Sequence, residues 1–258
     1  MGSGAIQYER KRIVGNWGID QKRPPAPYIF DDFLGDTLNT DLWVASSPQA
    51  TGGTDFAIST TAGDPVAGHG GWIAGTTGTG DDDEEIINGE ILWTPSRAVG
   101  GRMLVFETRL SAPVVTTIRL SAGFTDVKNE GPFDLGASDA ITSTATDAAA
   151  WIVDTDADTD EWFGLNVDTN ADGDLVSGAG APTAATATVL RIEIDALGQC
   201  FYYFDDSESD QALPALIGSD TTGVTETVAL TPFVDVLTRG DVDNQVVEVD
   251  YLFISCAR

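Results

Sequence analysis

Alternating carboxylate and amide side chains in residues 168–174 have the spacing of a cation-binding loop. The segment Asp168-Thr169-Asn170-Ala171-Asp172-Gly173-Asp174 matches the first half of a calcium loop, D-x-[DN]-x-[DN]-G. Oxygen atoms at alternate positions can converge on one hard cation, but position 12 of such a loop would be Ala179 instead of glutamate, which excludes a full EF-hand. Two interpretations stay open: a Ca²⁺ site formed by Asp168, Asn170, Asp172 and Asp174, or a polar turn between two strands.

Two further acidic runs indicate solvated surface segments. Residues 81–85 read Asp-Asp-Asp-Glu-Glu, and carboxylates alternate at positions 154, 156, 158 and 160. Like charges at this spacing repel each other unless water or a cation separates them. We therefore expect both runs to be loops or turns at the surface.

The chain lacks the residue sets of a nucleophilic hydrolase or a phosphate-binding enzyme. His69 is the single histidine and lies in a glycine-rich stretch, where we expect an exposed loop residue instead of a member of a triad or a zinc site. No G-x-x-x-x-G-K-[ST] phosphate loop occurs. The two cysteines, Cys200 and Cys256, are too few for a disulfide framework, and we expect buried thiols.

Charge is divided unevenly along the chain. Residues 1–26 contain five of the 13 Lys and Arg residues and two of the 41 acids, a net charge of +3, whereas the remaining body carries a net charge of −31. A body of this charge repels nucleic acids and anionic membranes, so we expect neither as a partner. No run approaches 18 apolar residues, and no apolar stretch follows the first charges, so we expect neither a transmembrane helix nor a secretory signal.

The basic segment has the composition of an attachment peptide. Its cations accompany a tyrosine and a tryptophan, and aromatic and arginine side chains are common anchors of protein interfaces. It ends in the stiff spacer Pro24-Pro25-Ala26-Pro27. We expect residues 1–27 to be an extended anchoring arm that lies along a partner or adds a strand to a sheet edge, the alternative being an unordered tail. The expected contact residues are Tyr8, Arg10, Lys11, Arg12, Trp17, Lys22 and Arg23.

The elements that must position these groups are strands. Apolar and charged side chains alternate strictly in residues 190–195, and residues 102–110 alternate with Thr108 as the polar exception. Gly198 suits a hairpin turn because it can adopt a positive φ. The expected strands are residues 28–34, 56–60, 71–74, 85–93, 102–111, 116–125, 149–154, 162–167, 188–195, 200–205, 225–235 and 245–255. Strands of this number without intervening helices indicate one two-sheet sandwich over residues 28–258.

Both ends of this region resemble concanavalin A-like (laminarinase or LamG-type) jelly rolls. Residues 30–43 read F-D-D-F-L-G-D-T-L-N-T-D-L-W, which is similar to the F-D-D-F…L-x-x-x-x-W opening strand of those domains. Residues 247–254, V-E-V-D-Y-L-F-I, resemble their closing strand. The resemblance implies an all-β, concanavalin A-like antiparallel β-sandwich (jelly roll) in which the first and last strands pair.

Enzymes of this family are glycoside hydrolases with carboxylates on one strand as E-x-D-x-E or E-x-D-x-x-E. Here Glu193-Ile194-Asp195 and Glu248-Val249-Asp250 supply only E-x-D, and the third glutamate is missing from both. Since glycoside hydrolysis needs two suitably separated carboxylates, we expect solvated strand faces instead of a catalytic pair. Sandwich lectins stack sugars on exposed aromatic residues, but the candidates are flanked by apolar residues and are expected in the core. They are Trp72, Trp93, Trp151 and Trp162.

Three internal segments resemble tailed-phage structural proteins of this fold. They are residues 122–126 (A-G-F-T-D), 142–148 (T-S-T-A-T-D-A) and 154–162 (D-T-D-A-D-T-D-E-W). The resemblance implies a non-enzymatic virion protein, assembled in the host cytoplasm, that decorates or cements the capsid surface. Its expected partner is the major capsid protein or another shell protein, and it is expected to be a homo-oligomer such as a trimer. A carbohydrate-binding or receptor-binding virion appendage and a diverged glycoside hydrolase stay open as alternatives.

Overall fold

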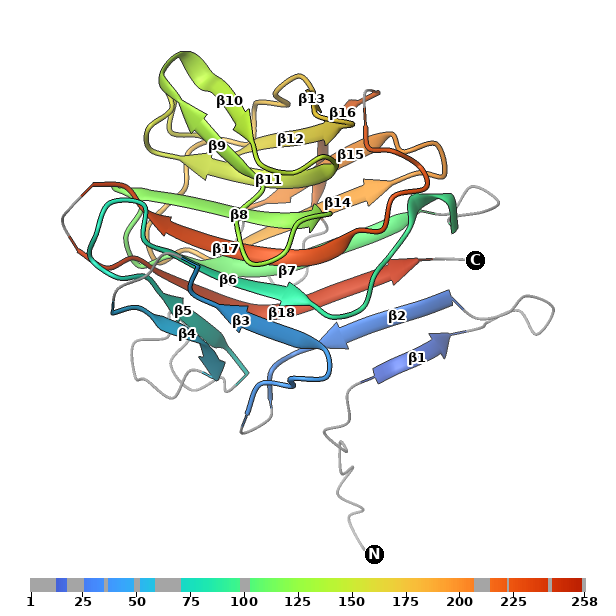
Figure 1. Cartoon of the computed structure of the whole chain (residues 1–258), viewed down its shortest axis with the longest axis horizontal. Coiled ribbons are helices and arrows are strands. Elements are labelled where there is room, and N and C mark those ends of the chain that lie inside the picture. The colour runs from blue at the N-terminus through green and yellow to red at the C-terminus, as the bar shows by residue number, and fades with distance from the viewer. Residues whose placement is uncertain are drawn as a thin grey trace, which may run out of the picture.

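The chain folds into two antiparallel β-sheets packed face to face (Figure 1). The computed structural model describes residues 13–17, 26–34, 37–48, 52–58, 71–97, 103–206, 214–221, 223–240 and 243–256. Within these ranges the only helical elements are two short 3-10 turns, Pro95–Arg97 and Ala137–Asp139. No helix in these ranges is long and apolar enough to cross a membrane.

Sheet A has nine strands in the order β1-β2-β18-β7-β14-β15-β16, with β5 beside β18 and β4 beside β5. The bounds are β1 Ile13–Trp17, β2 Ala26–Asp31, β4 Thr54–Ile58, β5 Ile73–Thr76, β7 Leu104–Ser111, β14 Thr188–Ile194, β15 Cys200–Asp205, β16 Ala215–Asp220 and β18 Val246–Cys256. One side of β18 pairs with β7, and the other side is shared by β5 and β2. The closing strand therefore pairs with the opening strand, as the resemblance implied.

Sheet B has seven strands in the order β13-β12-β11-β8-β17-β6-β3. The bounds are β3 Trp43–Ser46, β6 Glu84–Gly89, β8 Ile118–Thr125, β11 Ala148–Asp154, β12 Phe163–Asp168, β13 Ala171–Asp172 and β17 Thr231–Thr238. A separate hairpin, β9 Phe133–Gly136 and β10 Ala140–Ser143, belongs to neither sheet. It lies within the connection between β8 and β11.

One part of the expected arm belongs to the sandwich. Residues 13–17 form β1, which pairs with β2 in antiparallel register at the edge of sheet A. The expectation that the whole of residues 1–27 lies outside the sandwich therefore does not hold for this strand. An edge strand can be supplied by a chain terminus because only one of its sides needs a hydrogen-bonded neighbour.

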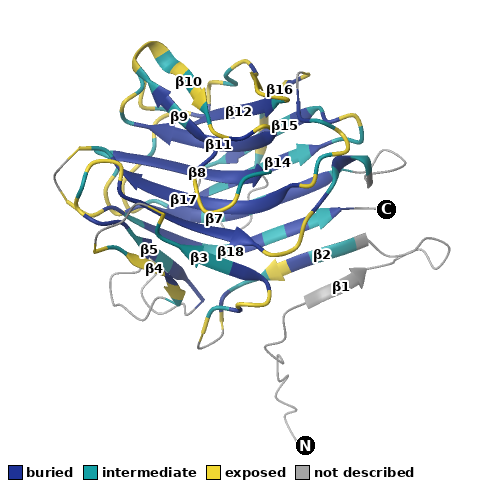
Figure 2. Cartoon of the chain, in the orientation of Figure 1, coloured by how far each residue is buried: buried dark blue, intermediate teal, exposed yellow. Residues whose placement is uncertain are grey.

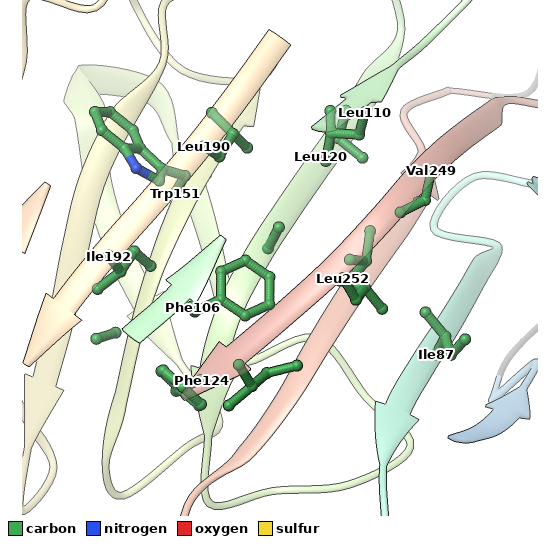
Figure 3. Close-up of a cluster of buried hydrophobic side chains, with 14 of the residues drawn as sticks. Ile87, Phe106, Leu110, Leu120, Phe124, Trp151, Leu190, Ile192, Val249 and Leu252 are labelled. Carbon is green, nitrogen blue, oxygen red and sulfur yellow. The ribbon is translucent and has the colours of Figure 1, made fainter. Parts of the chain in front are cut away.

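Apolar side chains from both sheets fill the space between them (Figure 3). Phe106 of sheet A meets Phe124 of sheet B with ring centroids 5.7 Å apart, and Trp151 packs edge-on against Tyr202 at 5.5 Å. β14 alternates as expected: Leu190, Ile192 and Ile194 are buried in the core, and Arg191 and Glu193 between them are partly exposed. Figure 2 shows buried residues along the central strands and exposed residues at the β10 end of the hairpin.

The opening motif at residues 30–43 has a structural role. Asp31 Oδ1 accepts the N–H of Phe33 at 3.1 Å, and Asp31 Oδ2 accepts the indole N–H of Trp43 at 2.8 Å. Phe33, with φ of 49°, and Trp43 are both buried in the main core. One aspartate thus ties the end of β2 in sheet A to β3 in sheet B.

Cys200 and Cys256 are two buried thiols that are not joined by a disulfide, which confirms the expectation. Burial raises the pKa of the Cys200 thiol well above its ordinary value, because an apolar setting disfavours the thiolate. Cys200 is therefore a packing residue and not a nucleophile.

Candidate functional site

Glu193, the first member of the first E-x-D pair, lies in a ladder of charged side chains on the outer face of sheet A. In the register of β14 and β7, Arg191 is opposite Glu107, and its Nη1 lies 2.8 Å from Glu107 Oε2. Arg191 Nε also donates to Glu193 Oε1 at 2.9 Å, and Tyr251 Oη donates to Glu107 Oε1 at 2.9 Å. We call Glu107, Arg191 and Glu193 the sheet A ladder. Glu193 is held by its arginine.

Asp195, the second member of that pair, closes a turn. Its Oδ1 accepts the N–H groups of Leu197 at 2.8 Å and Gln199 at 3.0 Å. Gly198 has φ of 87°, which confirms the predicted hairpin between β14 and β15. Glu193 therefore pairs with Arg191 on the strand, and Asp195 stabilises the turn that follows it.

Only one member of the second E-x-D pair is in contact with solvent, so the expectation of a solvated strand face was wrong for Glu248. Glu248 is buried, with Ser111 Oγ 3.4 Å from its Oε2, whereas Asp250 is partly exposed and lies 3.3 Å from Arg109 Nη1. The pairing of β18 with β7 shifts register between Val249 and Tyr251. Val247 and Val249 lie in the core, so both carboxylates are on the outer face of β18, and only their burial differs.

The segment at residues 168–174 forms the tight hairpin between β12 and β13. Asp168 pairs with Ala171, and Val167 pairs with Asp172, so Asp168 and Asp172 lie on opposite faces. Asp168 Oδ1 accepts the hydroxyl of Thr225 at 2.8 Å. Among the described residues no group of three or more His, Cys, Asp or Glu side chains is arranged to hold a metal ion. Calcium binding by Asp168, Asn170, Asp172 and Asp174 stays a prediction.

All four candidate tryptophans are buried, as the flanking apolar residues predicted. Trp151 is fully inaccessible, and Trp93, the most exposed of them, has 6% of its surface accessible. Trp151 donates its indole N–H to the carbonyl of Arg191 at 3.1 Å. These rings are core residues and offer no stacking platform to a sugar.

Most of the expected arm contacts lie outside the described residues. This applies to Tyr8, Arg10, Lys11, Arg12, Lys22 and Arg23, and also to His69. For Trp17, only the backbone is described, at the end of β1. The predicted partner contacts of these residues therefore stay predictions.

The sequence analysis missed a cluster of arginines and carboxylates on the outer face of sheet B. Strand register places Asp154, Arg119 and Glu84 in one row across the sheet, with Leu237 between the last two. Asp235 and Ser121 occupy the next row on the same face. We call the following residues the sheet B cluster: Glu84, Arg119, Asp134, Asp154, Asp235 and Arg239.

Arg119 lies at the centre of the sheet B cluster. Its Nη2 contacts both Glu84 Oε1 and Asp235 Oδ2, and its Nη1 contacts Asp134 Oδ1. Ser121 Oγ donates to the other oxygen of Asp235. Arg119, Glu84 and Asp235 are all at most 3% exposed, so one cation and two carboxyl groups meet almost without water, whereas Asp134 is 41% exposed.

Arg239 joins the remaining carboxylates. Its Nε donates to Asp154 Oδ1 at 2.9 Å, and its Nη2 lies 2.7 Å from Asp134 Oδ1. The N–H of Leu135 donates to Asp154 Oδ2 at 3.0 Å. Asp154 is therefore a buried strand residue, and the expectation that its acidic run is entirely a solvated loop was wrong for this position.

Burial and the two arginines act in opposite directions on the pKa values of the sheet B cluster. Burial, reinforced by Asp235 and opposed by Arg119, raises the pKa of Glu84 from 4.5 to about 8, so Glu84 is mainly protonated at neutral pH. For Asp134, burial acts in the same upward direction, but Arg119 and Arg239 outweigh it and lower the pKa below its ordinary value. The cluster therefore combines a neutral carboxyl with charged ones under the same arginine.

The connection between β8 and β11 covers the sheet B cluster. The N–H of Gly131 donates to Glu84 Oε1 at 2.7 Å, and a side chain at position 131 would collide with Arg119, Asp235 and Glu84. Beside this contact, Phe133 and Leu135 pack on Ile86 and other apolar residues of the same face. A substrate cannot reach Glu84 or Asp235 in this arrangement.

The signal that sequence reasoning misread was the acidic run at residues 81–85. Asp83, Glu84 and Glu85 are buried, so the solvated-turn expectation was wrong for these three. Glu84 and Glu85 begin β6, which continues into the apolar pair Ile86 and Ile87. Two acids that run directly into an apolar strand are the available hint. The partners of Glu84 come from β8 and β17, far away in sequence, and that of Glu85 is Ser47.

Comparisons with known proteins bear on the fold alone. No protein-family profile and no curated protein sequence matches the chain. Among solved structures, a protein of unknown function from Shewanella oneidensis MR-1 is similar at 12% identity, with a TM-score of 0.58 over 90% of this chain and 87% of that chain.

Two structures with printed activities are similar to the same degree. The Bacillus licheniformis β-glucanase has 12% identity and a TM-score of 0.56, over 88% of this chain and 97% of the glucanase. The carbohydrate recognition domain of Emp47p has 8% identity and a TM-score of 0.54, over 87% of this chain and 93% of that domain. The chain therefore has the all-β, concanavalin A-like sandwich fold that β-glucanases and carbohydrate recognition domains share.

Proposed function

We propose that this chain is a non-enzymatic virion structural protein that decorates or cements a phage capsid, and that its basic N-terminal segment attaches it to the shell. The expected partner is the major capsid protein or another shell protein. Repeated copies, each with a short anchor, would then reinforce the capsid surface through multivalent attachment.

The observation that carries the proposal is the division of charge between the first 26 residues and the body. Residues 1–26 have a net charge of +3 on a chain with a net charge of −28. Every Lys or Arg side chain that the structure describes in the body is already paired with an acid of the body. These residues are Arg109, Arg119, Lys128, Arg191 and Arg239. The cations of the N-terminal segment are thus the best candidates for contact with a partner.

The state of the candidate chemical groups supports a non-enzymatic role. Glu193 is held by Arg191, Asp195 closes a turn, and Glu84 and Asp235 lie beneath Gly131. Glycoside hydrolysis requires two carboxylates that reach opposite sides of a bound sugar. The carboxylates named here contact protein groups instead.

A cosedimentation experiment tests the attachment. The full-length protein, the triple variant Arg10→Gln, Lys11→Gln, Arg12→Gln and the body variant Lys128→Gln are each spun with purified tailed-phage capsids at low and high salt. We expect saturable binding by the full-length chain and by Lys128→Gln, and weaker, less salt-sensitive binding by the triple variant. Equal binding by all three proteins, or no binding by any, would overturn the proposal.

A second assay separates the alternatives. The same full-length protein is incubated with laminarin and with a soluble mixed-linkage β-glucan, and reducing ends and bound polysaccharide are measured. We expect neither hydrolysis nor retention. Release of reducing ends would identify a diverged glycoside hydrolase, and saturable retention without hydrolysis would identify a carbohydrate-binding appendage.

A further inference from the structure

The connection at residues 126–147, which contains β9 and β10, is a strap across the outer face of sheet B. It joins β8 to β11, and these two strands are direct neighbours in which Thr125 pairs with Ala148. The N–H of Asp126 donates to the carbonyl of Asp147 at 3.0 Å, which closes the base of the strap. The strap can therefore lift without breaking a strand pair of sheet B. Figure 1 shows β9 and β10 as a hairpin apart from the strands of both sheets.

The strap is fastened by a small set of apolar and polar contacts. Phe133 and Leu135 cover apolar residues of sheet B, and Gly131 and Leu135 donate their N–H groups to Glu84 and Asp154. Asp134 meets both arginines of the sheet B cluster. Asn129 N donates to Asn88 Oδ1 at 3.0 Å, and Lys128 forms a 3.7 Å ion pair with Glu90. Further hydrogen bonds join Ser138 and Asp139 to Asp158, Thr146 to Asn170, and Asp147 to Thr225.

Glu84 is the titratable group that the strap shields. Its carboxyl meets Arg119 of β8, Asp235 of β17 and Gly131 of the strap. The other polar groups of this face are Ser121, Asp134, Asp154 and Arg239. Its side chain is 2% exposed, and Gly131 of the strap covers its carboxyl. Lifting Gly131 removes that cover, while Arg119 and Asp235 stay on sheet B.

We propose that residues 126–147 form a latch that opens locally, without unfolding of the sandwich, and that deprotonation of the carboxyl pair under Gly131 favours the open state. Opening uncovers the apolar face around Ile86 and Phe233 together with Glu84 and Asp235. This inference does not depend on the proposed attachment to a capsid.

The direction of the pH dependence follows from proton linkage. In the closed strap the pKa of Glu84 is about 8, mainly because of burial, whereas contact with water returns it toward 4.5. Between these two values the closed state holds a proton that the open state releases. The open population therefore rises with pH by up to about tenfold per pH unit, and it levels off above about pH 8.

Hydrogen–deuterium exchange of the full-length protein measures this opening. Peptides from residues 126–147 are followed from pH 5.5 to 8.5, with labelling times scaled so that the intrinsic chemical exchange is equal at each pH. Peptides from β14 and β15 report global unfolding under the same conditions. We expect the strap peptides to be less protected than the β14 and β15 peptides at every pH, and to lose protection with rising pH.

Two matched variants identify the group that controls the opening of the strap. Glu84→Gln keeps the size of the carboxyl but cannot titrate, so its strap protection should not change with pH. Glu90→Gln removes the surface carboxylate that meets Lys128 and should keep the wild-type pH dependence. Three results would each overturn the proposal: strap protection that does not change with pH, strap protection as high as that of β14 and β15, or an unaltered pH slope in Glu84→Gln. If Glu84→Gln does not fold, the wild-type comparison of strap with β14 and β15 still decides whether a local, pH-dependent opening exists.

Discussion

The outer faces of the two sheets carry the same chemistry in two different settings. In the sheet A ladder, Arg191 has 28% of its side chain exposed, and its partners Glu107 and Glu193 have 20% and 16% exposed. In the sheet B cluster, Arg119 has 3% exposed and Asp235 none. The strap makes the difference, because it excludes water from one face and leaves the other in contact with solvent.

This difference in exposure changes what each arginine contributes to the stability of the fold. Exposed ion pairs are screened by water and salt and add little to stability. Buried pairs lose their hydration on folding, so the net gain is modest, but removing one partner leaves an uncompensated charge in a dry site. The comparison predicts a strong response to changes around Arg119 and a weak one around Arg191.

The largest effect is expected for Arg119→Met. It removes the cation shared by Glu84, Asp134 and Asp235, and we expect the free energy of unfolding to fall by about 3–5 kcal/mol. Urea unfolding at pH 7, followed by tryptophan fluorescence, measures the change. A loss below about 1 kcal/mol would show that the sheet B cluster behaves like a surface ladder.

The next effect is the pH dependence of wild-type stability. The pKa of Glu84 is about 8 in the folded protein and 4.5 without burial, so the folded state binds the extra proton between these values. Its contribution to the free energy of unfolding is present at low pH and is lost as pH rises, by at most about 1.4 kcal/mol per pH unit. Urea midpoints of wild type and Glu84→Gln should be closest near pH 5, where both side chains are neutral, and should separate toward pH 9 as the wild type loses stability. Parallel curves would contradict this assignment.

A smaller loss of stability, with the opposite pH dependence, is expected for Asp134→Asn. Arg119 and Arg239 lower the pKa of Asp134 in spite of its burial, so its charge stabilises the fold above its ordinary pKa of 3.8 and loses this effect as pH falls. Its side chain is 41% exposed, so solvent screening limits the loss to about 1 kcal/mol at pH 7. Thermal unfolding at pH 7 and at pH 3 should show the difference from wild type shrinking in acid.

The smallest effect is expected for Arg191→Met. Because all three groups of the sheet A ladder touch water, we expect a loss below about 1 kcal/mol, and a smaller loss in 1 M salt. The control is Arg119→Met under the same conditions, whose loss should depend less on salt. Equal losses for the two arginines would remove the distinction between the two faces.

Most of the strand positions could be predicted from the sequence because alternation is a local property. Each of the twelve expected strands overlaps an observed one, and the range 200–205 coincides with β15. β1, β3, β9, β10, β13 and β16 were missed. They are short or rich in small and polar residues, and their pairing partners decide that they are strands.

The site could be predicted far less well. The hairpin at Gly198, the buried tryptophans and the buried thiols follow from neighbouring residues. The burial of Glu84 and Asp154 could not be predicted in this way, because an acid within an acidic run is expected to be solvated unless its partner is known. Here the partners are Arg119, 35 residues after Glu84, and Arg239, 85 residues after Asp154.

By itself, the sequence determined an all-β chain with alternating strands, a charge divided between a basic segment and an acidic body, and no complete glucanase triplet. These properties depend on residues within a few positions of one another. Only the tertiary structure decided which acids lose water, that Glu84, Asp134 and Asp235 share Arg119, and that a strap between β8 and β11 covers them. The physical reason is that desolvation depends on what packs above a side chain, and here that cover is set by strand pairing between distant parts of the chain.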